Sequence, residues 1–145
     1  MNLPEYVTVD EVRRVCKELG ISDWTAVTEA DITVEEAGKI LAEVNVAGMN
    51  INVEDFRQGL AVELEHGTRF EDANVTNNHP ILTGKIVLAH LKETLDYYHR
   101  LDVAEVEGDL MHAVIAGDLA RIQAKYRKLI TVKGALHRAV SDQFK

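Results

Sequence analysis

The sequence is poor in the residues that mark secreted and membrane-spanning proteins. Its 145 residues include a single cysteine, Cys16, so no disulfide can form within the chain. Secreted chains use cysteines in pairs, which favours a reducing compartment and leads us to expect a cytoplasmic protein. The N-terminus is acidic and lacks the apolar run of a signal peptide. No segment approaches the roughly 18 consecutive apolar residues of a membrane helix, so we expect no membrane partner.

Signals for β-structure and for common enzymes are also missing. No stretch alternates apolar and polar residues for more than a few positions, and hairpin turn sequences are absent. No phosphate-binding loop, dinucleotide fingerprint or serine-hydrolase elbow occurs, so the sequence gives an enzymatic function no support and leaves it undecided. The fold class expected is therefore all-α. We expect one domain over residues 1–145, folded as a single bundle of about six helices.

Polar capping residues and glycines mark the ends of the first helices. Thr8 with Glu11, and Thr33 with Glu36, follow the Thr-x-x-Glu pattern of a capping box. This pattern predicts a helix that begins directly after each threonine. Gly20 is expected to end the first of these helices, because glycine readily adopts the left-handed conformation found there.

The later helices are predicted from similar signals. Asn52 and Pro80 mark two further helix starts. We expect the first of these helices to stop at Gly67 and the second to run to about residue 104. Gly108 and Gly117, each followed by an aspartate, are expected to bracket one short helix before the last one.

Charge divides the chain near residue 118. Residues 118–145 hold seven Lys or Arg against two Asp, for a net charge of +5, whereas residues 1–117 hold nine against 22 acids, for −13. An acidic body repels phosphate backbones, which disfavours nucleic acid as a partner except through basic residues 121–145. The basic segment also carries an apolar stripe. We therefore expect residues 118–145 to form a helix that packs on the acidic body or on a partner.

The segment AVELEHG, residues 61–67, places a carboxylate where a helix should be apolar. At about 100° per residue, with Phe56 at zero, Glu63 falls at about −20°, in the middle of the apolar arc. Its neighbour Glu65 points the opposite way, into solvent. Because burying an unpaired carboxylate is strongly unfavourable, Glu63 needs polar partners.

Two interpretations of Glu63 remain open. In the first, it belongs to a buried Glu–His–Tyr hydrogen-bond network that fixes helix register and needs no cofactor. The candidate members of that network are Glu63, His66, His90, Tyr97, Tyr98, Asn74 and Thr76. In the second, Glu63, His66 and His90 bind a metal, because two imidazoles and a carboxylate suit zinc or non-haem iron. A straight antiparallel helix pair would leave His90 about 13 Å from the level of His66, so this site requires helices that cross.

The remaining histidines share no spacing that would make a site. These histidines are His79, His99, His112 and His137. We expect them at the surface or in interfaces.

The run EDFRQGLAVELEHGTRFEDANVTNNHPILTGKIVLAHLKETLDYYHRL, residues 54–101, resembles a family of short bacterial and phage proteins classed as a domain of unknown function. The resemblance extends more loosely back to about residue 33, which makes 33–107 the family-like core. It implies no activity. It implies that ten polar or aromatic residues belong to one shared pattern: Glu63, His66, Asn74, Thr76, Thr83, Lys85, His90, Asp96, Tyr97 and Tyr98.

The sequence therefore leaves two candidate functions open. The first is a small acidic, non-enzymatic helical module that binds another protein or itself, through residues 118–145 in the case of a homo-oligomer. The alternative is a metal-binding helical protein that uses Glu63, His66 and His90 as ligands of zinc or iron.

Overall fold

The computed structural model describes residues 4–145, and their regular secondary structure is entirely helical. The six α-helices and the single 3-10 turn, η1, are α1 (Val9–Leu19), α2 (Val34–Val44), α3 (Val53–Arg69), η1 (Glu71–Ala73), α4 (Pro80–Glu93), α5 (Tyr97–Ile115) and α6 (Leu119–Asp142). The predicted all-α class with about six helices is thus confirmed. Within residues 4–145, no helix combines the length and the apolar character needed to cross a membrane.

The helices are divided between two compact units. The first unit ends at Lys92 and contains α1 to α4, and the second, Glu93–Lys145, contains α5 and α6. Each unit has buried apolar residues of its own.

Local signals explain where most helices of the first unit begin. The hydroxyl of Thr8 accepts a hydrogen bond from the Glu11 amide, as predicted for the start of α1. Thr33 and Glu36 form a complete capping box at the start of α2. Gly20 has φ of +62° and ends α1, so the predicted left-handed cap is confirmed.

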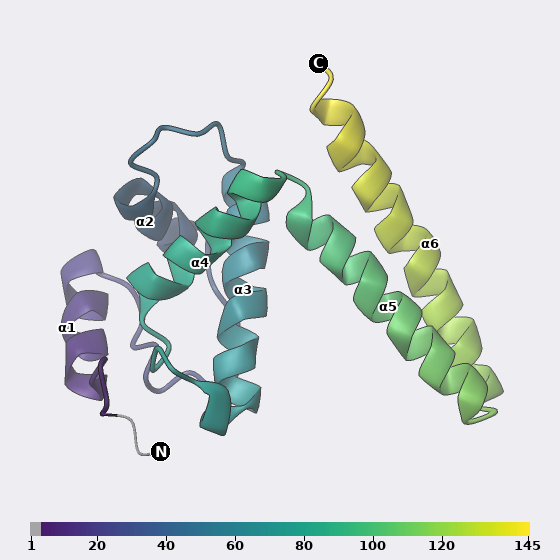
Figure 1. Ribbon diagram of the computed structural model, residues 1–145, viewed down its shortest axis with the longest axis horizontal. Coiled ribbons are helices and arrows are strands. Elements are labelled where there is room, and N and C mark those ends of the chain that lie inside the picture. The colour runs from purple at the N-terminus through teal and green to yellow at the C-terminus, as the bar shows by residue number, and fades with distance from the viewer. Residues whose placement is uncertain (1–3) are drawn as a thin grey trace. The chain divides into compact units, whose positions relative to one another are not determined.

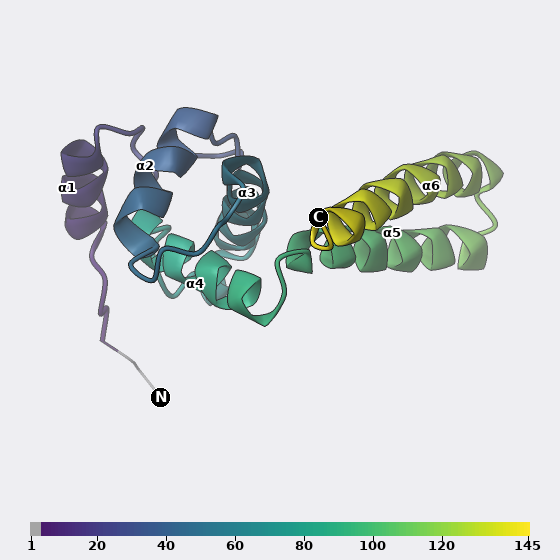
Figure 2. The same ribbon diagram turned by 90° about the horizontal axis from the view of Figure 1, so that it is seen from above.

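The core of the first unit is built where α2, α3 and α4 meet. Ile40 and Phe56 are fully buried, and α4 runs obliquely across α3 (Figures 1 and 2). Gly84 allows α4 to lie close to α2 at this point, because a Cβ atom there would lie 2.7 Å from Ile40 Cγ2 and 3.3 Å from Val44 Cγ1. The first unit is therefore packed around a helix crossing that leaves no room for a larger residue at position 84.

The single helix predicted from Pro80 to about residue 104 is wrong, because the structure breaks it between Glu93 and Tyr97. At the break, Asp96 is almost fully buried and accepts hydrogen bonds from the Thr94 hydroxyl and from Arg100 Nε and Nη2, the last two at 2.9 and 2.8 Å. Side chains such as Thr and Asp that bond locally offer the backbone an alternative to continued helix.

The second unit is a hairpin of two helices that run side by side in opposite directions (Figures 1 and 2). The turn between them contains Gly117, with φ of +67°, so the predicted helix stop at this glycine is confirmed. The stop predicted at Gly108 is wrong, because α5 continues through it to Ile115. Packing of α5 on α6 outweighs the modest helix penalty of one internal glycine.

Candidate functional site

Glu63 lies on α3 with its side chain only 14% exposed, whereas the side chain of Glu65 is 49% exposed. The inward direction derived from the helical wheel therefore agrees with the structure. His66 Nδ1 lies 3.5 Å from Glu63 Oε2, and His90 Nε2, from α4, lies 3.7 Å from Glu63 Oε1. The carboxylate is thus flanked by one imidazole from its own helix and one from the next.

The crossing of α3 and α4 makes this arrangement possible. A straight antiparallel pair would have separated His90 from the end of α3, but the oblique path of α4 brings it to Glu63 (Figure 1). Even so, residues 4–145 contain no group of three or more His, Cys, Asp or Glu side chains placed to hold one metal ion.

The other predicted members of the network belong to the loop before α4 and to the second unit. Asn74 and Asn78 bond to each other: Asn74 Nδ2 donates to Asn78 Oδ1 at 3.0 Å, and Asn74 Oδ1 accepts from the Asn78 amide at 3.2 Å. Thr76 contributes its carbonyl, which accepts from the His79 amide. Tyr97 and Tyr98 belong to the second unit, where their rings meet edge to face with centroids 5.2 Å apart.

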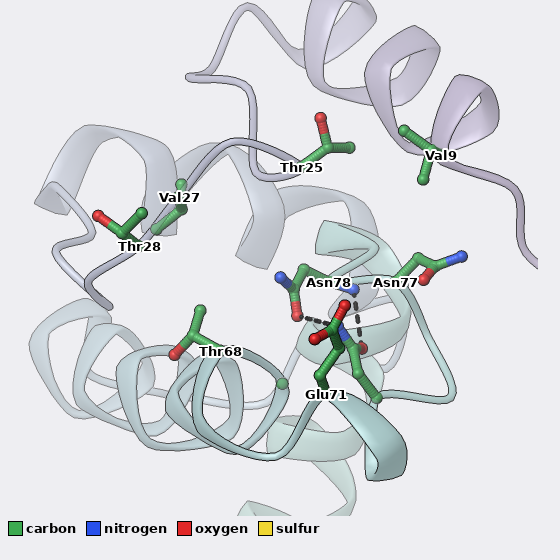
Figure 3. Close-up of a pocket in the computed structure, with 10 residues that line it drawn as sticks. Val9, Thr25, Val27, Thr28, Thr68, Glu71, Asn77 and Asn78 are labelled. Carbon is green, nitrogen blue, oxygen red and sulfur yellow. Dashed lines mark hydrogen bonds between the residues drawn. The ribbon is translucent and has the colours of Figure 1, made fainter.

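A polar pocket of about 380 Å³ lies in the first unit, next to the Asn74–Asn78 loop. Its lining comes from the start of α1, the loop before α2, the end of α3 and η1, and Figure 3 shows Thr25, Thr68, Glu71 and Asn78 around it. Hydroxyl and amide groups dominate, and Glu71 is the single charged residue of the lining. The pocket is therefore suited to a hydrophilic occupant and offers no aromatic surface for stacking.

The pocket depends on an unusual loop conformation. Asn77 and Asn78 both have left-handed backbone, with φ of +48° and +60°, which asparagine tolerates better than most residues. Asn78 also needs a glycine opposite, because a Cβ atom at Gly67 would lie 2.1 Å from Asn78 Oδ1. The prediction that α3 stops at Gly67 is therefore wrong, because the helix continues to Arg69. Gly67 instead lets the loop lie against the last turns of α3.

A buried carboxylate that the sequence marked only as a cap is Glu36. It accepts hydrogen bonds from Ser22 N and Oγ at 2.8 and 2.6 Å, and from Thr33 N and Oγ1 at 3.1 and 3.0 Å. Burial acts to raise the pKa of Glu36, but these four donors outweigh it and hold the pKa below its ordinary value. Glu36 thus ties the loop after α1 to the start of α2.

Asp96 has the same character in the second unit. Its paired hydrogen bonds to Arg100 are the main reason that its pKa lies below the ordinary value, against the opposing effect of burial. A carboxylate bonded in this way is already satisfied, which supports a structural role at the start of α5.

His79 was expected at the surface or in an interface, and this expectation is wrong, because only 8% of the residue is exposed within the chain itself. Its Nδ1 accepts hydrogen bonds from the amides of Ile81 and Leu82 at 3.2 and 3.4 Å, so the imidazole caps α4. Burial lowers the pKa of His79. The sequence signal for this role was its position directly before Pro80, the first residue of the helix.

The two faces of the α5–α6 hairpin differ. One face, here called the ion-paired face, consists of Asp102, Asp109, Arg121, Lys125 and Lys128. Lys125 and Arg121 both contact Asp109, and Lys128 Nζ lies 3.9 Å from Asp102 Oδ1. The basic helix predicted at residues 118–145 therefore packs, within this unit, on acidic positions of α5.

The opposite face, here called the apolar face, consists of Met111, Val114, Leu119, Tyr126 and Ile130. With Val106 and Leu129 at zero on their wheels, these five residues lie at about +60° to +140°, whereas the ion-paired face lies at negative angles. In an antiparallel pair, angles of one sign fall on one face. Each of the five is more than half exposed.

Comparison with known proteins gives the family and no activity. Residues 12–107, about two thirds of the chain, match the family described as Protein of unknown function (DUF5661). The chain belongs to this family. The match begins earlier than the resemblance noted in the sequence, in α1, and ends within α5. No curated protein and no solved structure is matched.

Proposed function

We propose that the chain is a small, non-enzymatic helical module that self-associates through the apolar face of its second unit. The asymmetry of the hairpin is the observation that supports this most directly. Three ion pairs join α5 to α6 on one face, while five large apolar side chains on the other are more than half exposed. Covering such side chains is favourable by about 25 cal/mol for each Å² of apolar surface buried.

The small core of the hairpin supports the same proposal. Its buried apolar cluster consists of Val106, Leu129 and Val132, with Val103 and Leu110 packed against them. Two helices bury little surface in return for the conformational entropy lost on folding. A second hairpin packed on the apolar face completes a four-helix bundle, and this arrangement buries the apolar face of each hairpin against that of the other.

Within this module we assign Glu63, His66 and His90 a structural role. The carboxylate contacts one imidazole on each of α3 and α4, which supports a joint that fixes the two helices relative to each other. The zinc or iron alternative is tested below by metal analysis.

We also propose a compartment, a source and a kind of partner for the protein. The single, buried Cys16 supports a reducing, cytoplasmic environment, and the sequence resemblance supports a bacterial or phage source. The ion pairs of α6 with α5 support a protein partner over nucleic acid.

Light scattering of the purified full chain over a range of concentrations tests self-association. We expect a molar mass of twice 16.2 kDa at high concentration, and this mass should fall to that of a single chain on dilution. Ile130→Arg should weaken the dimer at least about tenfold, because it places a charge in an apolar contact. Ala124→Arg adds the same side chain at an exposed position of α6 away from the apolar face, and should leave the dimer intact. A parent chain that stays monomeric at all concentrations would contradict the proposal.

A further inference from the structure

We propose that the two copies pair with their hairpin turns at the same end, so that α5 of one lies over α6 of the other, and that Glu107 and Lys133 select this arrangement. This inference rests on the proposed self-association and names the residues that set its geometry.

Two-fold symmetry allows two ways to bring the apolar faces together. If the axis runs along the hairpin, both turns lie at the same end and each α5 faces the partner's α6. If the axis runs across the hairpin, the turns lie at opposite ends, and α5 faces α5 while α6 faces α6. Apolar contact alone is compatible with either.

Charge separates the two arrangements. Helix α5 carries four acids and one Arg, for −3, whereas α6 carries six basic residues and one acid, for +5. With the turns together, each acidic helix faces a basic one. With the turns apart, helices of like charge face each other, which disfavours that dimer.

One ion pair lies on the same side of the hairpin as the apolar face. Lys133 Nζ lies 2.8 Å from Glu107 Oε1, and both side chains are about half exposed, at 55% and 50%. On the wheel these residues lie at about +40° and +100°, next to the apolar residues. With the turns together, Glu107 faces Lys133 of the partner subunit, and the four groups alternate in sign. With the turns apart, Glu107 faces a second Glu107.

A charge-inverted chain, Glu107→Lys/Lys133→Glu, tests this selection. The inverted chain keeps its internal pair and should form its own dimer. A dimer of one parent and one inverted chain places Glu against Glu and Lys against Lys when the turns are together. After mixing with ¹⁵N-labelled parent, native mass spectrometry should show about tenfold fewer mixed dimers than the statistical half.

The control inverts a pair on the ion-paired face, Asp109→Lys/Lys125→Asp, and should mix with the parent statistically. An excess of mixed dimers with the Glu107/Lys133 chain would show that α5 faces α5 and overturn the inference. Statistical mixing would also overturn it, because the pair would then select nothing. Both results leave self-association standing, whereas a parent that is monomeric by light scattering refutes the proposed function itself.

A distance measurement gives an independent answer if the inverted chain does not fold. Spin labels on Ser141→Cys, in a Cys16→Ala background, report the separation of the two open ends of the hairpins. Helix α6 has 24 residues and is about 36 Å long. With the turns together the labels should lie within about 25 Å, set by the width of a four-helix bundle. A separation of one helix length or more would overturn the inference.

Discussion

The two units differ in how completely their apolar side chains are buried. The first has fully buried residues on all four of its helices or their connections, such as Val12, Trp24, Phe56 and Val87, and a net charge of −8. The second has a small buried cluster, equal numbers of acidic and basic residues, and an apolar face left open. A unit with a complete core is stable by itself, whereas a helical hairpin gains much of its stability by packing on another surface. This contrast in burial is what places the proposed self-association in the second unit.

The strongest test of this contrast uses one glycine from each unit. Gly84→Ala should lower the free energy of unfolding by about 1–3 kcal/mol, because the added methyl group meets Ile40 and Val44 in a packed core. Gly108→Ala should raise it by about 0.5–1 kcal/mol, because the added Cβ would point into open space and alanine favours helix. Urea unfolding measures both. Equal effects of the two substitutions would contradict the contrast in packing.

The next test concerns the joint between α3 and α4. Glu63→Ala should cost about 1–2 kcal/mol, because it removes the carboxylate that two imidazoles contact in a largely buried position. Glu65→Ala should cost less than about 0.5 kcal/mol, because the carboxylate of Glu65 is half exposed and pairs with Arg69 one turn away. Thermal unfolding of the two variants distinguishes these values. If both lose the same small amount, Glu63 does not join the helices.

A pH test addresses the first unit alone. The pKa of buried His79 lies below its ordinary value of about 6.5, so the unfolded chain takes up a proton before the folded one does. The contribution of His79 to stability is therefore complete above pH 6.5 and is lost as the pH falls toward the lower folded pKa. Protonated Nδ1 also cannot accept the amides of Ile81 and Leu82.

The group that opposes this loss is the carboxylate of Glu11, whose charge favours protonated His79, while Arg14 and Lys85 disfavour it. His79→Asn retains a capping oxygen and removes the titration. The melting temperature of the parent should fall more than that of the variant between pH 7 and pH 5. Parallel curves would show that the cap does not titrate.

The smallest expected effect is that of metal. Elemental analysis of the purified protein should find zinc and iron at well below one ion per chain, and chelation should leave the melting temperature unchanged, because residues 4–145 contain no group of three or more His, Cys, Asp or Glu side chains placed to hold one ion. A stoichiometric ion that disappears in His90→Ala would reinstate the metal-binding alternative.

Features set by neighbouring residues were predictable from the sequence, and features set by distant contacts were not. The capping pair Thr33–Glu36, the turn at Gly117 and the inward direction of Glu63 follow from spacing along one helix. The bond from Ser22 to Glu36 joins residues 14 apart and has no local signal. His90 could be named as a candidate partner of Glu63, but its approach depends on the crossing of two helices, which has no local signal.

The break before α5 shows the same limit. Its cause is the buried carboxylate of Asp96, held by Thr94 and Arg100, and the choice between this cluster and a continued helix is made by burial. Gly108 is the reverse case, because its intrinsic preference predicted a stop that packing of α5 on α6 overrides.

The family match ends at Glu107, and the apolar face begins four residues later, at Met111. Under the proposed self-association, the residues that fold the first unit and the residues that select a partner lie in separate segments of the chain, before and after Lys92. Substitutions around the Gly117 turn can change which chains assemble together without disturbing the interior of the other unit.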